Sequence, residues 1–442
     1  MYLTSLRRAP MRIPRHITML LRPTLPTAPP ARHSSPIHTQ APPALTAEQT
    51  AIVKSTAPVL EQHGTAITSH FYKRILAAVP ELRNVFNAAH QESGEQQSAL
   101  ARAVWGYAAH IDDLDKLSST VSRIGHKHAG LGVAPEHYPI VGEHLLASIE
   151  EVLGDGVNAT VMEAWAAAYA QLASIFIGFE KGLYDAAAAT PGGWNGWRSF
   201  VVEQKTPESG EITSFHLAPQ DGLPLPPFRP GQFVTIRCFV PGLNLFQPRQ
   251  YSLSAPPGSS RFRISVKREG AGTGKPAGHI SSLLHDGTPA GAVLDLSMPY
   301  GDFTLDAEAT TPVVLLSGGV GLTPMLSMLQ TIASAPSERK VHFVHAARNR
   351  GAHAMRDELA SVVEGNANVS RAVYYDEVGE GDVKGVDYDF KGRVEFAKTE
   401  ELVEGADYYI CGPVPFMAKQ RADLERLGVE PGRIHSEVFG AA

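Results

Sequence analysis

The stretch that decides the fold is VVLLSGGVGLTP, residues 313–324. Its apolar start predicts a buried strand, its glycines predict a tight turn, and its last residues predict the start of a helix. Glycine lets a backbone come close to a dinucleotide, and the amino end of a helix favours phosphate groups. The pattern differs from the usual GxGxxG, so alone it is a weak indication. The candidate cofactor-binding residues here are Gly318, Gly319, Val320, Gly321, Leu322 and Thr323.

Outward from this turn, apolar runs alternate with helix-like stretches. The runs lie at residues 312–316, 341–345 and 408–411, and their alternation with helices is typical of a doubly wound parallel sheet. We predict such an α/β domain over residues 309–442. The preceding residues, 198–308, contain β-rich runs at 200–203, 212–217, 233–239 and 262–267 between proline and glycine clusters. This pattern predicts an antiparallel β-barrel.

Residues 45–185 carry apolar side chains at helical spacing, and Thr46 and Gln49 match a capping box at their start. We therefore predict an all-α domain there, in a multidomain chain. The segment AAAATPGGWNGW, residues 186–197, is small and glycine-rich and is predicted to be a linker. Residues 164–179 are uncharged, but a membrane span needs about 20 apolar residues. We expect a buried core helix there and no transmembrane segment.

The composition is that of an ordinary folded chain, with 43% hydrophobic and 19% charged residues among 442. Lys plus Arg number 39 and Asp plus Glu number 45, which gives a formal net charge of -6. Because there is no basic excess, we expect no nucleic-acid partner. Cys238 and Cys411 are the only cysteines, which excludes a disulfide framework and a CxxC zinc site.

Residues 1–44 differ from the rest of the chain. The first acidic residue is Glu48, and the stretch before it is rich in arginine, proline, serine and threonine. An acid-poor, arginine-containing start predicts an organelle transit peptide, which would place the protein in the mitochondrial matrix. The alternative is an unstructured proline-rich leader on a cytoplasmic protein, because prolines interrupt the amphipathic helix that import needs.

His128 ends an apolar stripe formed by Leu114, Leu117, Val121 and Ile124 on one predicted helical face. A neutral imidazole in that position can coordinate a metal that lies in an apolar interior, such as a haem iron. The alternative, which the spacing alone favours, is a core histidine that is satisfied by a backbone carbonyl.

Short motifs follow one another through the second half of the chain. RPGQF at 229–233 and RQYS at 249–252 resemble the PGQ strand and the RxYS motif of the ferredoxin reductase-like flavoproteins. YICGP at 409–413 and HSEVFG at 435–440 resemble the CGP strand end and the C-terminal tail of the same group. With His70-Phe71-Tyr72, residues 80–87, residues 94–100, Lys127-His128 and residues 136–146, they make residues 45–440 resemble the flavohaemoglobins.

The resemblance implies a globin domain that binds haem b. It makes His128 the proximal iron ligand, with Tyr138 and Glu180 in a network behind it; the alternative for Glu180 is an ordinary acid that closes the last helix. It makes Phe86 the aromatic ring packed on the porphyrin and places Lys127 among the cofactor-binding residues. Tyr72, Gln96 and Leu100 form the distal pocket, where a phenol and an amide can donate hydrogen bonds to dioxygen.

The resemblance also implies FAD and NAD(P)H sites. Arg249 would pair with a flavin phosphate, Tyr251 would lie against the isoalloxazine ring, and Ser252 would bond the flavin edge. Phe233 stands where the family usually carries tyrosine, so no hydroxyl contact is expected there. The other implied cofactor-binding residues are Gln250, Cys411, Gly412, Pro413, Glu437, Val438, Phe439 and Gly440. Phe439 would shield the flavin and move aside for nicotinamide, unless it is only a core residue at a strand end.

The implied activity is that of a nitric oxide dioxygenase. Reducing equivalents would pass from NAD(P)H through FAD to haem, and nitric oxide and dioxygen would become nitrate. An oxygen-binding globin sensor or store would not need the reductase motifs, and a haem-free flavin reductase would leave Tyr72, Phe86 and His128 unexplained. We expect a monomer, and the choice between NADH and NADPH stays open.

Overall fold

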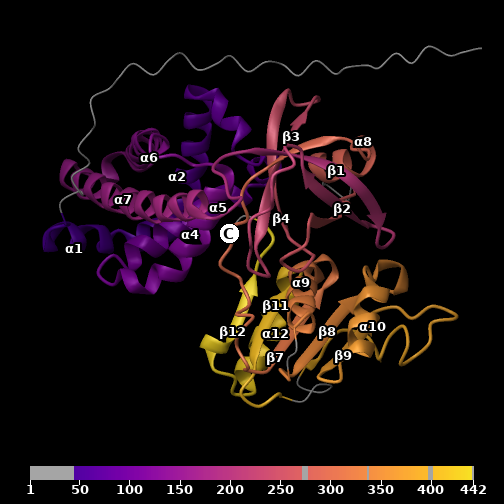
Figure 1. Ribbon diagram of the computed structural model, residues 1–442. Coiled ribbons are helices and arrows are strands. Elements are labelled where there is room, and N and C mark those ends of the chain that lie inside the picture. Colours follow the sequence, from indigo (N-terminus) through magenta and orange to yellow (C-terminus); the bar gives the residue numbers. More distant parts are fainter. Residues whose placement is uncertain (1–43, 271–276, 336–337, 397–401, 441–442) are drawn as a thin grey trace, which may run out of the picture. The chain divides into compact units, whose positions relative to one another are not determined.

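The computed structural model describes residues 44–270, 277–335, 338–396 and 402–440. The predicted leader therefore lies outside the described residues, except for its last residue. Figure 1 shows a helical region, a β region and an α/β region in this order along the chain. This order confirms the predicted fold class.

The helical region is built around α2, α4 and α6, whose apolar faces share one core. Helix α1 begins with the predicted capping box: Thr46 Oγ1 accepts from Gln49 N at 3.1 Å, and Gln49 Oε1 accepts from Thr46 N at 3.0 Å. Three 3-10 helices, Pro80–Asn84, Leu114–Leu117 and Gly154–Gly156, join the longer ones. The α-helices are α1 (Ala47–Ser55), α2 (Ala57–Ala78), α3 (Ala88–Ser93), α4 (Glu95–Ala109), α5 (Ser118–Leu131), α6 (His137–Leu153) and α7 (Ala159–Ala189).

Helix α7 corrects two expectations. It continues to Ala189, so the first residues of the predicted linker are helical, because alanine has the highest helix propensity and four alanines precede Thr190. It is also not buried all round: 28% of its most apolar 18-residue window is buried, and only one face packs against the other helices. By length and composition, α7 alone among the described helices could cross a membrane, with a mean hydropathy of 1.2 in that window.

The β region is a six-stranded antiparallel sheet in the order β4-β3-β6-β1-β2-β5. A bridge between Leu253 and Ile264 joins its two edges, which closes the sheet into a barrel. The RQYS motif forms the end of β4. The elements are β1 (Arg198–Pro207), β2 (Ile212–Pro219), β3 (Phe233–Val240), β4 (Leu245–Ser252), β5 (Phe262–Lys267), α8 (His279–Gly287) and β6 (Val293–Leu296).

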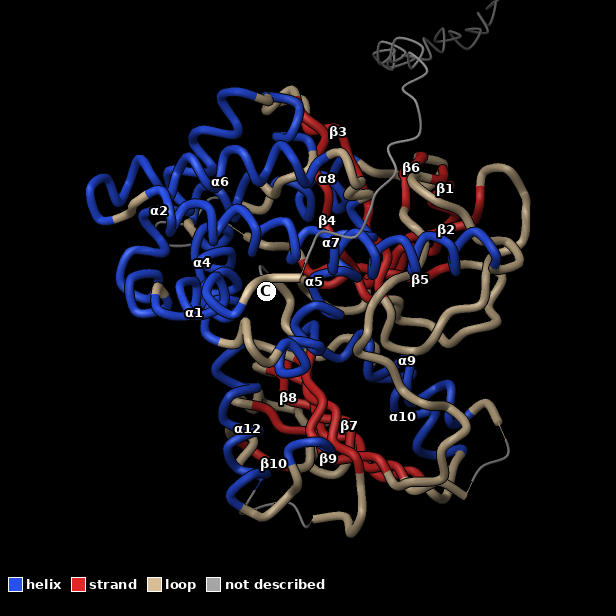
Figure 2. The backbone as a smooth tube through the Cα atoms, turned by 90° about the vertical axis from the view of Figure 1, so that its left-hand side faces the viewer, coloured by secondary structure: helices blue, strands red, loops and turns tan. Residues whose placement is uncertain are grey.

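The α/β region contains a parallel sheet in the order β10-β9-β8-β7-β11-β12. Alternate residues of β7 enter different cores: Val313 and Leu315 pack with α9 and α10, and Val314 and Leu316 pack with α12. Figure 2 shows these helices on opposite sides of the sheet, as a doubly wound fold requires. The elements are β7 (Val313–Gly318), α9 (Leu322–Ala333), β8 (Val341–Ala347), α10 (Arg356–Gly365), β9 (Val369–Tyr375), β10 (Phe390–Lys391), β11 (Asp407–Cys411), α12 (Val414–Arg426) and β12 (Ile434–Glu437).

Candidate functional site

His128 lies on α5 with a carboxylate behind its ring. Its Nδ1 is 2.7 Å from Glu180 Oε1 and 3.3 Å from Tyr138 Oη, and Tyr138 Oη donates to the same Glu180 oxygen at 2.5 Å. An ionised carboxylate can only accept, so this contact places the imidazole proton on Nδ1 and leaves Nε2 with a free lone pair. Burial and the Glu180 charge both raise the pKa of the Tyr138 phenol, which therefore stays a donor.

Tyr72 and Gln96, predicted to share a pocket, are brought together by α2 and α4. Tyr72 is 4% exposed; burial raises the pKa of its phenol, although a hydrogen bond with the Gln96 side chain acts in the opposite direction. The Phe86 ring stands edge-on to Tyr72 with centroids 5.3 Å apart. Leu100 packs on the same core. The four side chains thus combine two hydrogen-bonding groups with apolar walls.

The helix that carries His128 also touches the barrel. Phe233 of β3 packs with Ala129 of α5 and Ala187 of α7 in one buried cluster. Gln250 Nε2 of β4 donates to the Lys127 carbonyl oxygen at 3.4 Å. Phe233 and Gln250 were predicted to bind cofactor, and the structure places them against Ala129 and Lys127, the two sequence neighbours of His128.

The C-terminal tail reaches the same helix. Lys127 Nζ donates to the Gly440 carbonyl oxygen at 3.1 Å. Burial lowers the pKa of Lys127, whereas the nearby Glu437 charge acts to raise it. Burial raises the pKa of Glu437 to about 7, and Lys127 opposes that shift. Val438 packs on the core next to α12, and Phe439 is 44% exposed.

Arg249 and Tyr251 lie on one face of β4. The Arg249 guanidinium is largely buried, which lowers its pKa, and its Nη1 donates to the Pro248 carbonyl oxygen at 2.6 Å. Among the residues that the structure describes, no carboxylate forms an ion pair with it. Burial raises the pKa of the Tyr251 phenol. Ser252 is 8% exposed and pairs across the ladder with Phe233.

The glycine-rich turn and the CGP segment meet at one sheet edge. Ser317 pairs with Cys411, and Cys411 pairs with Glu437, so the carboxyl ends of β7, β11 and β12 lie together. A methyl group on Gly321 would lie 2.3 Å from the Cys411 carbonyl oxygen, so only glycine permits this approach. The winding reverses between β7 and β11, and doubly wound sheets bind ligands at such a point.

That edge gathers the remaining predicted nucleotide-binding residues. Gly318 ends β7, Gly319 has a positive φ of 55°, and α9 begins at Leu322 and Thr323 after Val320 and Gly321. Gly412 and Pro413 follow β11 directly and lead into α12. Burial raises the pKa of the Cys411 thiol well above its usual value, so this group stays protonated and is no nucleophile.

Comparisons with known proteins agree with this arrangement. A globin family model matches residues 69–176, and a model described as an oxidoreductase NAD-binding domain matches residues 315–422. The flavohemoprotein of Bordetella pertussis is 56% identical over 90% of this chain and 98% of its own length, and that of Rhizobium meliloti is 54% identical over the same shares. The chain belongs to the flavohaemoprotein family.

Solved structures extend the likeness of this flavohaemoprotein. A flavohemoglobin from Malassezia yamatoensis, with bound FAD and heme, has a TM-score of 0.78 and 26% identity over 90% of this chain and 100% of its own. The FAD/NAD-binding domain of nitric oxide dioxygenase from Vibrio cholerae has a TM-score of 0.50 and 37% identity over 55% of this chain and 98% of its own. The likeness therefore covers both halves, as the sequence motifs indicated.

The flavohaemoprotein's own residues fit both prosthetic groups. His128 Nε2 is the unprotonated nitrogen that iron requires, and Tyr72 and Gln96 offer polar groups between the apolar walls of Phe86 and Leu100. The buried Arg249 lacks a carboxylate partner among the described side chains, so the phosphate of FAD suits it as a counter-ion. These roles remain predictions for the individual residues.

Sequence reasoning missed residues whose importance depends on contacts between domains. Gln247 of β4 is completely buried: its Oε1 accepts from Ala88 N at 2.8 Å and its Nε2 donates to the Arg83 carbonyl oxygen at 2.9 Å. Asn84 Oδ1 accepts from Phe246 N at 2.8 Å. Both side chains join the globin to the barrel. The strand LFQPRQYS contains several polar residues, so the local sequence did not single out Gln247 or identify its partner.

Proposed function

We propose that this flavohaemoprotein is an NAD(P)H-dependent nitric oxide dioxygenase that converts nitric oxide and dioxygen to nitrate. The observation that carries the proposal is the double role of α5. This helix holds His128 against Glu180 and, through the Lys127 carbonyl, touches the strand that carries RQYS. An oxygen-binding site and a reductase site are thus joined through a single helix. A relative similar to the reductase half bears this activity in its name.

When bound, haem supplies the iron at which dioxygen and nitric oxide meet, and FAD converts a two-electron hydride into single electrons. The chain's own residues prepare these sites. Glu180 keeps the proton on His128 Nδ1, which orients the ring and makes Nε2 a stronger donor. Tyr72 and Gln96 offer hydrogen-bond donors to negative charge in the distal pocket, and Leu100 and Phe86 keep water away.

On the reductase side, the chain offers positively polarised groups to the phosphates of the two nucleotides. The Arg249 guanidinium supplies a buried cation next to the barrel, and the turn before α9 supplies backbone N–H groups and the helix amino end. Phe439 is 44% exposed and is not fixed in a core. This exposure suits an aromatic side chain that must give way to the nicotinamide.

The direct test is a reconstitution under anaerobic conditions. Purified protein containing haem and FAD is reduced separately by NADH and NADPH while the visible spectrum is recorded, and oxygen and nitric oxide are then admitted. We expect flavin and haem bands in one protein, a Soret shift on reduction, and one nitrate formed per nitric oxide consumed. Reduction without any nitrate would refute the proposed activity, and haem alone or flavin alone would support a globin store or a flavin reductase instead.

The iron ligand has a separate test. His128→Ala removes the proposed iron ligand, so stable haem binding is expected to be lost. Oxidation of NAD(P)H with an artificial electron acceptor is expected to persist, because the flavin and nicotinamide residues lie on other elements. Retained haem with undiminished nitric oxide consumption would contradict the assignment.

Two further proposals concern the whole chain. We propose that residues 1–44 direct import into the mitochondrial matrix, because they contain no acidic residue and several arginines. A fluorescent protein fused to residues 1–45 should then colocalise with mitochondria, and a cytosolic signal would contradict this. We also propose a monomer, for which sedimentation of the loaded protein at several concentrations is the check.

A further inference from the structure

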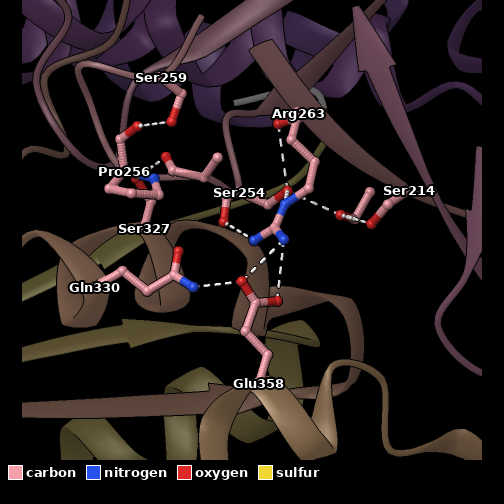
Figure 3. A network of polar contacts seen from close by, with 10 residues as sticks. Ser214, Ser254, Pro256, Ser259, Arg263, Ser327, Gln330 and Glu358 are labelled. Carbon is pink, nitrogen blue, oxygen red and sulfur yellow. Dashed lines mark hydrogen bonds and ion pairs between the residues drawn. The ribbon is translucent and has the colours of Figure 1, made fainter. Parts of the chain in front are cut away.

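The barrel and the α/β domain are joined next to the RQYS motif. Beyond β4 the chain continues to Ser254 and Ala255, and both residues contact other parts of the molecule. Figure 3 shows the polar network around them, in which Arg263 of β5 lies between Ser254 and Glu358 of α10. None of these side chains belongs to a motif in the sequence.

Arg263 forms a fork between the two domains. Its Nη1 donates to both Glu358 oxygens, at 2.9 and 3.0 Å, while Nη2 donates to the Ser254 carbonyl oxygen at 2.5 Å and Nε donates to Ser254 Oγ at 3.1 Å. The Arg263 side chain is 11% exposed and that of Glu358 is 28% exposed. A planar guanidinium held at every nitrogen fixes direction as well as distance.

Helix α9 adds two hydrogen bonds to the same contact between the barrel and the α/β domain. Ser327 Oγ donates to the Ala255 carbonyl oxygen at 2.8 Å, and Gln330 Nε2 donates to Glu358 Oε1. Ser327 and Gln330 lie one turn apart on one face of α9, the helix whose amino end follows the glycine-rich turn. The phosphate-binding helix is therefore bonded directly to the chain that leaves the flavin-binding strand.

Few residues separate this polar contact from the two predicted cofactor sites. Ser252, the predicted contact of the flavin edge, is separated from Ser254 by one residue, and Thr323 precedes Ser327 by one helical turn. The apolar part of the domain contact, where Ile212 and Phe303 enter the α/β core, favours closeness but has no preferred direction. The hydrogen bonds of Arg263, Glu358 and Ser327 are directional, so they fix the orientation of one domain relative to the other.

We propose that Arg263, through Glu358, is a positioning residue that sets the nicotinamide against the flavin for hydride transfer. In that step the C4–H bond of NAD(P)H breaks and its two electrons and proton form an N–H bond at flavin N5, so NAD(P)H is oxidised and FAD is reduced. The proposal rests on the FAD and nicotinamide sites of the proposed function and is independent of the haem chemistry. Arg263 lies outside both cofactor sites, yet the reaction would depend on it.

The test uses Arg263→Lys, which keeps the charge but loses the fork, and Glu358→Gln, which keeps the shape but loses the charge. Flavin reduction by NADH and NADPH is followed anaerobically by stopped flow in the full-length, cofactor-loaded protein. We expect the limiting rate to fall by about 10- to 100-fold, since a misplacement of about 1 Å costs up to about 10²-fold. The half-saturating nicotinamide concentration should change by less than about threefold, because the phosphate-binding turn is untouched.

Two readouts separate positioning from a general loss of structure. The long-wavelength charge-transfer absorbance, formed when NAD⁺ is added to the reduced flavoprotein, should weaken in both variants. Amides of residues 253–255 and 322–330 should exchange hydrogen faster, while those of α5 should not change. Bound FAD and the melting temperature are measured alongside, and a rate loss that merely follows lost FAD would overturn the proposal.

Arg261 offers a matched control. It directly precedes β5 and pairs with Glu203 of β1, so its ion pair stays within the barrel. Arg261→Lys and Glu203→Gln should reduce flavin at the wild-type rate. The proposal is overturned if Arg263→Lys and Glu358→Gln also do so, or if the control variants slow the reaction equally. A wild-type protein that reduces its flavin but forms no nitrate would refute the dioxygenase assignment and leave this inference standing.

Discussion

A methyl group added to Gly130 would lie 2.6 Å from Thr235 Oγ1 and 3.2 Å from the Phe233 ring. Gly130 belongs to α5 and the other two residues to β3, so the absence of a side chain allows α5 to approach the barrel. Thr235 is completely buried and cannot easily yield. The two domains can approach this closely because residue 130 is glycine, which has a hydrogen atom where every other amino acid has a Cβ carbon.

Gly130→Ala should separate α5 from β3 and slow electron flow from flavin to haem. Overpacking of this kind costs about 1–3 kcal/mol, so the melting temperature should also fall. Haem reduction after rapid flavin reduction is the measurement, and flavin reduction by NAD(P)H itself should be unaffected. Gly182→Ala in α7, where an added methyl group meets nothing within 4 Å, is the control. Equal haem reduction rates in both variants would contradict the prediction.

Glu180→Gln should raise the reduction potential of the haem iron. The amide can still accept from His128 Nδ1 at the observed 2.7 Å, but it lacks the negative charge that makes the imidazole a strong donor. Loss of such a partner usually lowers metal affinity or activity by about 10- to 100-fold. Spectroelectrochemical titration measures the potential. Glu180 lies inside α7 and does not close it, so a potential equal to that of the wild type would mean that its charge does not influence the iron.

Tyr72→Phe should speed the release of bound oxygen. The variant keeps the ring against Phe86 but removes the only phenol of the distal group. A lost hydrogen bond of about 1.4 kcal/mol corresponds to a rate about tenfold faster. Oxygen dissociation is measured by stopped flow with a scavenger for released oxygen. An unchanged rate would transfer the role to Gln96.

A buried histidine pair predicts acid sensitivity of the α/β domain. His345 is completely buried. Its Nδ1 lies 2.8 Å from Ser317 Oγ, and its ring centroid is 4.8 Å from that of His353. Burial lowers the pKa of His345 from 6.5 to about 4. Between pH 6.5 and 4 the unfolded chain therefore binds a proton that the native protein does not bind. Stability should fall as the pH falls through this window, by about 1.4 kcal/mol per pH unit.

His345→Asn isolates that contribution. The Asn amide can replace the Nδ1 contact with Ser317 but does not titrate. Urea unfolding from pH 7 to pH 4 should show a shallower loss of stability in the variant than in the wild type. Parallel curves would show that His345 does not control the acid response. His353, whose pKa burial also lowers, contributes to the remaining slope.

Local signals predicted the fold class, and they supplied the candidate residues for the cofactor sites. The capping box at Thr46, the turn at Gly319 and the strand at Tyr409 each depend on residues that are close in the sequence, so their patterns can be recognised directly. Other important residues contact partners more than 90 residues away in the sequence, namely Gln247, Gly130 and Arg263. The local sequence around them does not identify those partners. The extension of α7 to Ala189 was misjudged because small residues suit helices and linkers alike.

Strand β4 has consequences for how this chain can vary. Within and just beyond its 8 residues, the chain bonds the start of α3 through Gln247, α5 through Gln250 and α9 through Ala255. Side chains alternate along a strand, so a single inserted residue would turn each following one to the wrong face. The surrounding loops can tolerate insertions. The length of this segment cannot change, because its contacts with three other parts of the molecule must all be kept.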